Sequence, residues 1–185
     1  MQELSKVKGF YRVTMDELAK EAGVSKRTLY RYFRGKDEII EATLEKFMTE
    51  VAKKMEEMIT PQDKPEKIFS SMLTILHYVG GYVGNPVILA DLRQHYPHYW
   101  KKIDDFRLRK GQEIIISRLF LDEENKKYIR DIDLRIVTTA IIAAIQAVAN
   151  PEFIIRNNLT FEETIRQLLE FFQHGFLKEN LDIDK

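Results

Sequence analysis

The chain has 185 residues, of which 44% are hydrophobic and 31% are charged, a composition typical of a soluble protein with a substantial core. Lysine plus arginine and aspartate plus glutamate both number 29, so any attraction to nucleic acid must come from a local patch. The chain has no cysteine, which excludes disulfides and thiolate chemistry. We see no signal peptide and no apolar run long enough for a bilayer, so we expect a cytoplasmic protein without a membrane partner.

Residues 1–8 are predicted to form a short helix that ends at Gly9, because glycine accepts backbone angles that other residues avoid. Phe10 and Tyr11 then supply apolar anchors before the next element. Neither this segment nor the rest of the chain contains an internal repeat or a low-complexity stretch.

The most informative segment, residues 14–36, reads TMDELAKEAGVSKRTLYRYFRGK. Thr14 and Glu17 have the spacing of a capping box that starts a helix. Gly23 suits the left-handed conformation that ends it, and Ser25 can cap a second helix. A helix, a short turn with glycine and another helix form the pattern of a helix-turn-helix.

The second helix of this segment is predicted to have an apolar face and a basic face. Val24 is expected to fill the space between the two helices, and Leu29, Tyr32 and Phe33 are expected to hold the second helix to the core. The positions between residues 24 and 36 include no acid and five cations, which are Lys26, Arg27, Arg31, Arg34 and Lys36. A basic exposed face is what a helix that contacts DNA requires.

Beyond residue 36 the apolar residues recur at three- and four-residue steps as far as about residue 59. This periodicity predicts one helix that is about 35 Å long at 1.5 Å per residue. Further helices are predicted at 65–83, 86–95, 98–121, 132–149 and 161–177, with a polar linker at 122–130 and an irregular piece at 153–158. We therefore expect an all-α protein in which the long helix links an N-terminal DNA-binding module to a separate C-terminal body.

The helix predicted at 65–83 weakens at Gly80 and Gly81, since each glycine inside a helix costs about 1 kcal/mol relative to alanine. One interpretation is a helix that ends in a glycine-rich turn, which the sequence favours. The other is a kink that opens space for a ligand.

The last two helical segments are broadly apolar. Residues 132–149 are apolar almost all round, so this helix is expected to be buried on most sides. One helix-turn-helix reads only a few base pairs, so useful specificity needs two copies. We therefore expect a homodimer in which 132–149 and 161–177 of both subunits form an isologous four-helix bundle. The alternative is that both apolar stripes face the protein's own core.

Residues 9–44 resemble the DNA-binding domain of the tetracycline-repressor (TetR/AcrR) family. The residues that carry the resemblance are Gly9-Phe10, Thr14, Ala22-Gly23-Val24-Ser25, Thr28-Leu29-Tyr30-Arg31-Tyr32-Phe33 and Gly35-Lys36. The resemblance implies an N-terminal three-helix helix-turn-helix DNA-binding domain at 1–46 and a larger helical ligand-binding and dimerisation domain at 47–185. In the family a longer helix precedes the glycine–aromatic pair, so we expect a first helix shortened by at least one turn.

The resemblance also implies a function. We expect a ligand-responsive repressor that binds a palindromic operator in double-stranded DNA as a dimer and is released by a small effector. The two reading helices would lie roughly 34–36 Å apart, in successive major grooves. Effector binding in the body would tilt the helix at 36–59 and change that spacing.

The DNA-contacting residues are predicted from their place in the motif. Arg27 can bond O6 and N7 of guanine, and by resemblance this position often reads a base. Thr28 can contact a phosphate or a thymine methyl group, and Tyr30 can bond a phosphate. The full predicted set is Thr14, Ser25, Lys26, Arg27, Thr28, Tyr30, Arg31 and Lys36. The alternative for any one of them is an ordinary surface residue.

The effector is expected to be mainly apolar, with one or two polar contacts. The residues predicted to bind it are Phe69, Met72, His77, Tyr78, Tyr82, Arg93, Trp100, Phe106, Ile141 and Gln146. The alternative for each is a packed core without a cavity, and the identity of the effector stays open.

Metal binding and catalysis are the rival chemistries. Asp91, His95 and His98 are a weak metal set, because Tyr96-Pro97 interrupts the helix between the histidines, so no metal or other cofactor is expected. No phosphate loop, HExxH or serine elbow occurs, and Asp104-Asp105 and Glu123-Glu124 are interpreted as solvated charges. We therefore do not expect an enzyme. A helical protein-binding module is the other alternative.

Overall fold

A computed structural model of the protein describes residues 1–177, with positions 115, 116, 120 and 176 described by their backbone alone. The end of the predicted body, 178–185, lies outside the described residues. The helices are α1 (Gln2–Arg12), α2 (Met15–Glu21), α3 (Lys26–Tyr32), α4 (Lys36–Met58), α5 (Pro65–Gly80), α6 (Pro86–Gln94), α7 (Pro97–Ile114), the π-helix η1 (Ile115–Phe120), α8 (Glu123–Lys126), α9 (Leu134–Val148), α10 (Pro151–Arg156) and α11 (Phe161–Phe176). The all-α prediction is confirmed, since within residues 1–177 the only β pairing is one isolated bridge between Ile129 and Leu177.

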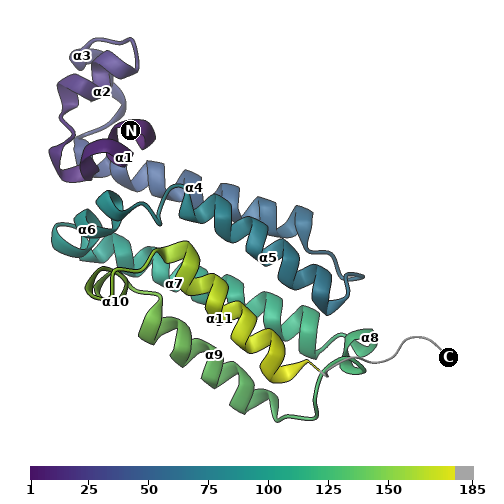
Figure 1. Ribbon diagram of the computed structural model, residues 1–185. Helices are drawn as coiled ribbons and strands as arrows, with labels where there is room; N and C mark the ends of the chain where they lie inside the picture. The colour runs from purple at the N-terminus through teal and green to yellow at the C-terminus, as the bar shows by residue number, and fades with distance from the viewer. Residues whose placement is uncertain (178–185) are drawn as a thin grey trace.

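The helix-turn-helix forms as its caps predict. The hydroxyl of Thr14 accepts a hydrogen bond from the Glu17 backbone N–H, and the Glu17 carboxylate accepts one from the Thr14 backbone N–H, which completes the capping box. Gly23 takes a φ of +66° at the turn, and Ser25 caps α3. These local interactions place α2 and α3 next to each other at one end of the molecule (Figure 1).

The first helix bends at Gly9, where φ is +75° and ψ is 168°. Helix precedes this point and one further turn follows it, so glycine interrupts α1 rather than ending it. A Cβ at Gly9 would lie 2.8 Å from Cγ of Asp91 on α6. Glycine therefore serves two needs here: a left-handed backbone and a close approach between α1 and α6. The bend turns Phe10, which is fully buried, into the core of the body.

The long helix predicted from residue 36 is α4, whose 23 residues correspond to about 35 Å. It leaves the module formed by α2 and α3 at the upper left of Figure 1. It then runs beside α5 along the body, which is the larger group of helices from α5 onward. Ile39 packs in the core of the module, whereas Leu44, Phe47 and Val51 pack in the core of the body. One rigid element thus joins the two regions. No described helix is long and apolar enough to cross a bilayer.

Several predicted details are wrong. Val24 is 39% exposed and Tyr32 is 67% exposed, because neither side chain joins the core of Val13, Leu18, Ala19, Leu29 and Ile39. The Tyr32 ring instead lies 5.1 Å from the guanidinium carbon of Arg31. The piece predicted to be irregular at 153–158 lies largely in α10, which Asn150 caps and Pro151 starts. The linker at 122–130 contains α8. At Gly80, α5 ends in a turn, which was the favoured interpretation.

The expected burial of the helix at 132–149 is also wrong for the single chain. Within α9 only Val137 and Ile141 are buried, and Ile136 is 65% exposed. The reason is the place of α9 at the edge of the body, where α7, α10 and α11 cover it from one side (Figure 1). On α11, Phe171 is 70% exposed. The two last long helices therefore leave large apolar side chains uncovered.

Candidate DNA-binding surface and ligand cavity

The start of α3 is built by two neighbouring hydroxyl groups. The Ser25 Oγ accepts a hydrogen bond from the Thr28 backbone N–H at 3.0 Å and lies 2.8 Å from Thr28 Oγ1. Leu29, 8% exposed, holds the other side of α3 to the core of the module. The first turn of α3 is thereby fixed in orientation while Lys26 and Arg27 stay exposed.

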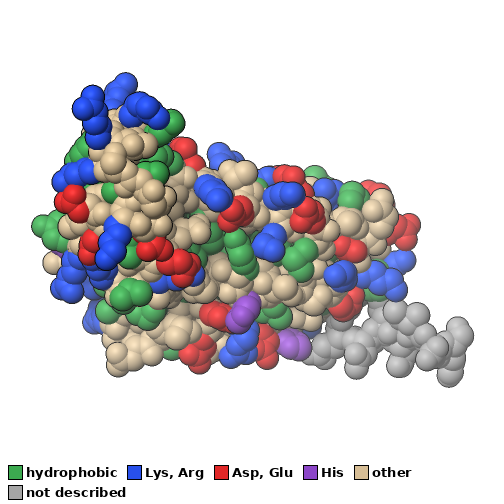
Figure 2. Space-filling model, turned by 90° about the horizontal axis from the view of Figure 1, so that it is seen from above, with side chains coloured by type: hydrophobic (Ala, Val, Ile, Leu, Met, Phe, Trp, Pro, Cys, Tyr) green, Lys and Arg blue, Asp and Glu red, His purple; other side chains and the backbone are tan. Residues whose placement is uncertain are grey.

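The predicted cations differ in how far they are free to meet a new partner. Lys26 Nζ lies 2.9 Å from Oδ2 of Asp16, which raises the pKa of Lys26. Lys36 donates to the backbone carbonyl of Tyr11 at 2.7 Å. Arg27 is exposed, and no ion pair with it occurs among residues 1–177. Figure 2 shows Lys and Arg side chains gathered at the end of the molecule that carries the module.

Two other predicted DNA-contacting residues already have partners. The Thr14 hydroxyl is occupied by Glu17, with which it makes hydrogen bonds as acceptor and as donor. Arg31 Nη2 donates to the hydroxyl of Tyr32 at 3.2 Å. Tyr30 is 48% exposed, so its hydroxyl can reach an external partner. The DNA contacts of the whole predicted set remain predictions.

Glu17, the acid of the capping box, is held in its charged form by its hydrogen-bond partners. The pKa of Glu17 is lowered to about 2, first by the hydrogen bond from the Lys8 ammonium and then by those from Thr14. The charged carboxylate thus links α1 to the start of α2.

The joint between the module and the body lies where α1 meets α6. The backbone N–H of Tyr11 donates to Oδ2 of Asp91 at 2.8 Å, and the rings of Tyr11 and His95 stack at 3.9 Å. Asp91 and His95, considered above as weak metal ligands, therefore hold α1. Within the described part of the chain, no group of three or more histidine, cysteine or acidic side chains is placed to hold a metal ion.

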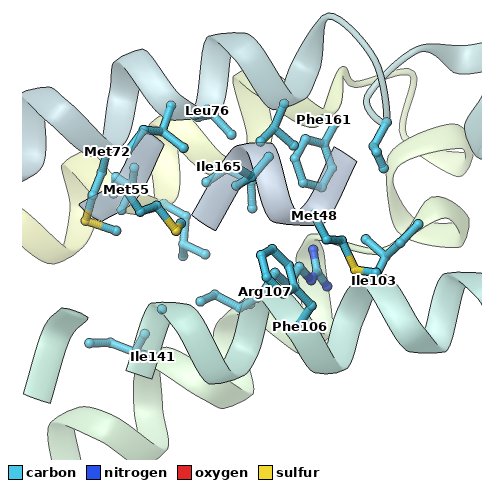
Figure 3. Close-up of a pocket in the computed structure, with 18 of the residues that line it drawn as sticks. Met48, Met55, Met72, Leu76, Ile103, Phe106, Arg107, Ile141, Phe161 and Ile165 are labelled. Atoms are coloured by element: carbon cyan, nitrogen blue, oxygen red, sulfur yellow. The ribbon is translucent and has the colours of Figure 1, made fainter. Parts of the chain in front are cut away.

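The body contains a cavity of about 150 Å³. Its walls come from α4, α5, α7, α9 and α11, and apolar side chains form almost all of the surface. Four residues of the predicted ligand set line it: Phe69, Met72, Phe106 and Ile141. Figure 3 shows Met55, Met72 and Ile141 toward one end, and Met48, Ile103 and Phe161 toward the other.

The other predicted ligand residues lie outside the cavity wall. His77 is exposed and pairs with Glu162 at 2.8 Å, while the Tyr78 hydroxyl donates to Glu50 at 2.9 Å. Neither side chain lines the cavity. The remaining residues outside the wall are Tyr82, which is buried in the core, Trp100, which packs against it, and Arg93 and Gln146, which are exposed.

The polar cavity residue that the sequence interpretation missed is Arg107 on α7. Its side chain is 16% exposed, and it pairs with Asp104, which is 24% exposed. Asp104, which was interpreted as a solvated charge, is partly exposed and also forms an ion pair with Arg107. The sequence does contain a pattern that indicates this position. Arg107 lies four residues after Ile103 and next to Phe106, so the helical period places its cation on the apolar face of the helix.

Comparisons with known proteins agree with this architecture. Residues 3–43 match the family described as bacterial regulatory proteins, tetR family. The chain is 29% identical over 175 residues to the uncharacterized HTH-type transcriptional regulator YvaF of Bacillus subtilis (strain 168), covering 93% of this chain and 89% of that one.

Solved structures show the same fold at low identity. The ketosteroid transcriptional regulator KstR2 of Mycobacterium tuberculosis aligns with a TM-score of 0.56 and 18% identity, over 96% of this chain and 91% of that one. A candidate fatty acid metabolism regulator of Clostridium perfringens aligns with a TM-score of 0.54 and 18% identity, over 96% of both chains.

Proposed function

We infer the following from the premise that this chain belongs to the tetR family of bacterial regulatory proteins and is a DNA-binding transcriptional regulator. It acts as a repressor that binds a palindromic operator as a homodimer. A small, mainly apolar effector enters the cavity of the body and releases the operator. The regulatory fold and relatives support regulation rather than catalysis.

The observation that carries this proposal is the double role of α4. Near its start, Ile39 packs in the core of the module that presents α3. Further along, Met48, Val51 and Met55 line the cavity. A ligand that displaces those side chains must therefore act on the same helix that orients the module. Such a ligand shifts the equilibrium between two arrangements only by its difference in affinity for them.

Dimerisation is supported by what α9 and α11 leave uncovered. Ile136 and Phe171 are large apolar side chains with 65% and 70% exposure. Pairing α9 and α11 with the same helices of a second copy would bury both residues in an isologous interface. The two α3 helices would then face successive major grooves about 34–36 Å apart.

The contacts with DNA divide into two kinds. Arg27 is the proposed base reader, because it is exposed at the first turn of α3 and its guanidinium can bond a guanine at two points. Lys36 and Tyr30 are proposed to contact phosphates, which position the module without reading sequence. Lys26 would have to exchange Asp16 for a phosphate.

The nature of the effector follows from the cavity. Its wall is apolar, so an apolar molecule gains from leaving water there. The names of two proteins with this fold refer to a ketosteroid and to fatty acid metabolism, which agrees with an apolar effector. Phe69, Met72, Phe106 and Ile141 are the proposed contacts.

The decisive experiment is selection of bound sequences from a random pool of DNA duplexes by the full chain. We expect enrichment of one site with two-fold symmetry, and an affinity that falls steeply with salt because phosphate contacts release counterions. Absence of any enriched sequence, together with no binding at low salt, would refute the DNA-binding function. An enriched site without symmetry would refute the dimer.

A further inference from the structure

Arg107 is the feature of the body that the apolar interior does not explain. Its terminal nitrogens Nη1 and Nη2 are buried and donate no hydrogen bond to any of the described residues. A buried donor without a partner costs free energy, and a charged one costs more. Figure 3 shows its nitrogen atoms among the apolar side chains of the wall, between Phe106 and Met48. The cavity therefore contains a polar group for which the described residues supply no complete set of acceptors.

The contacts that Arg107 does make leave one edge of the guanidinium free. Its Nε donates to Asp104 Oδ1 at 2.6 Å. Nη2 lies 2.5 Å from the same oxygen as an ion pair, without the alignment of a hydrogen bond. The ring centres of Trp100 and Phe161 lie 5.3 Å and 6.0 Å from the guanidinium carbon. The edge between Nη1 and Nη2 is the part that remains for another acceptor.

The chemistry of that edge selects the ligand. Two N–H donors of a guanidinium match the two oxygens of a carboxylate, which makes a charge-assisted, two-point contact. Asp104 approaches the guanidinium at its other edge, between Nε and Nη2. Its carboxylate is 24% exposed, so water can solvate its negative charge when a second carboxylate binds nearby. A pure hydrocarbon would fill the cavity but leave the donors of Arg107 unsatisfied.

The size of the cavity limits the apolar part. A space of about 150 Å³ compares with an apolar cavity that holds benzene. Met48, Met55 and Met72 line it, and methionine side chains adapt readily to a new occupant. Because these methionines can make room for slightly more than the six carbons of benzene, a carboxylate of about eight carbons is a suitable probe.

We propose that the effector is a medium-chain carboxylate whose chain lies among the apolar side chains of the cavity and whose carboxylate binds Nη1 and Nη2 of Arg107. This inference rests on the proposed function, because it assigns the chemical class of the effector in the same cavity.

The test uses octanoate as the probe and methyl octanoate and octan-1-ol as neutral controls. Binding to the full chain is measured by titration calorimetry without DNA. We expect octanoate to bind at least about tenfold more tightly than either control, since a hydrogen bond to a charged group is worth about 1.5–3 kcal/mol. Equal affinities for the three molecules, or no binding of octanoate, would overturn the proposal.

Variants assign the selectivity to the guanidinium. Arg107→Met should lower the affinity for octanoate about ten- to a hundredfold and leave that for octan-1-ol within about threefold. Asp104→Asn should raise the affinity for octanoate, because it keeps an oxygen acceptor for Nε and removes the neighbouring negative charge. Arg109→Met, an exposed cation on the same helix, is the matched control and should change neither affinity. Thermal unfolding identifies any variant that is not folded.

If Arg107→Met lowers the affinities for octanoate and for octan-1-ol by the same factor, the guanidinium does not recognise the carboxylate. Operator binding, measured separately by fluorescence anisotropy with and without octanoate, distinguishes this inference from the proposed function. Octanoate that binds through Arg107 without releasing the operator would refute the regulatory coupling alone. Operator release by neutral apolar molecules, with no binding of octanoate, would refute the carboxylate alone.

Discussion

The module formed by α2 and α3 and the body around the cavity use the same kinds of residues in opposite ways. In the module, Arg27 is exposed, and the helix that carries it, α3, is capped by the short polar side chain of Ser25 at the surface. In the body, Arg107 is enclosed by aromatic and aliphatic groups. An exposed guanidinium keeps its hydration until an external phosphate or base replaces it. An enclosed one has already lost that hydration and therefore discriminates strongly between occupants of the cavity.

The two regions also differ in how they are stabilised. The core of the module is small and consists of Val13, Leu18, Ala19, Leu29 and Ile39. The core of the body extends from Phe10 to Leu177 and takes in most of the other helices. A core as small as that of the module contributes little free energy by itself, so its orientation depends on α1 and α4. This dependence is the physical basis of the proposed coupling between the body and the DNA-binding surface.

The largest expected effect comes from breaking the proposed dimer, whose interface belongs to the body while the expected loss is in DNA binding by the module. The double variant Ile136→Glu and Phe171→Glu should be a monomer in sedimentation velocity at micromolar concentration, since each charge would have to be buried in the interface. Operator affinity should fall at least about a hundredfold, because base contacts worth about 1–3 kcal/mol each no longer add across two half-sites. Val7→Glu, at an 80% exposed position on α1, is the control. A variant that stays dimeric would contradict the proposed interface.

The second effect tests the division of roles on the DNA-binding surface. Arg27→Ala should lower operator affinity by about ten- to a hundredfold, the loss of about 1–3 kcal/mol expected for a two-point contact with guanine. Preference at one base pair should relax in a repeated selection from random duplexes. Lys36→Ala should weaken operator and random DNA equally, because a phosphate contact carries no sequence information. If Arg27→Ala also weakens both DNAs equally, it is not a base reader.

The third effect concerns the joint between the regions. Gly9→Ala should lower the free energy of unfolding by about 1–3 kcal/mol, because it places a side chain at a φ of +75° and 2.8 Å from Asp91 Cγ. Urea unfolding followed by circular dichroism measures the change. Gly111→Ala, in open space on α7, should instead stabilise by up to about 1 kcal/mol through helix propensity. Equal stability of Gly9→Ala and the parent chain would contradict the close approach of α1 and α6.

The smallest effect is a pH dependence that belongs to the module. The folded pKa of Glu17 is about 2, below its ordinary value of 4.5, so its contribution to stability is complete above pH 4.5 and is lost as the pH falls toward 2. The parent chain should be more stable than Glu17→Gln at pH 7, and the difference should shrink between pH 4.5 and pH 3. Thermal unfolding of both proteins across this range provides the measurement. A difference that is independent of pH would rule out the charged capping box.

Local features were predictable from neighbours in the chain. Thr14 with Glu17, the turn at Gly23 and the cap at Ser25 depend on residues three or four positions apart, and all are present. The start of α4 at Lys36 follows from an equally local periodicity. The exposure of Val24 was not predictable in this way, because it depends on which elements lie above the turn.

The ligand set shows where sequence interpretation stops. Phe69 and Met72, which the apolar periodicity of their helix suggested, line the cavity, and their contact with a ligand stays a prediction. His77 and Tyr78 follow on the same helix but point to Glu162 and Glu50. The sequence predicted that all four residues bind the ligand. The orientation of α5 in the body instead places Phe69 and Met72 in the cavity wall and leaves His77 and Tyr78 outside it.

The sequence by itself determined the helical class, the helix-turn-helix and the long helix that follows it. These features depend on periodicity and on caps, which act over one or two turns of helix. Only the tertiary structure decided that α1 bends at Gly9 onto α6, that α9 leaves Ile136 uncovered and that Arg107 faces an apolar cavity. Each of these depends on how residues far apart in the chain pack together, because burial is a property of all surrounding elements and not of the residue or its neighbours in sequence.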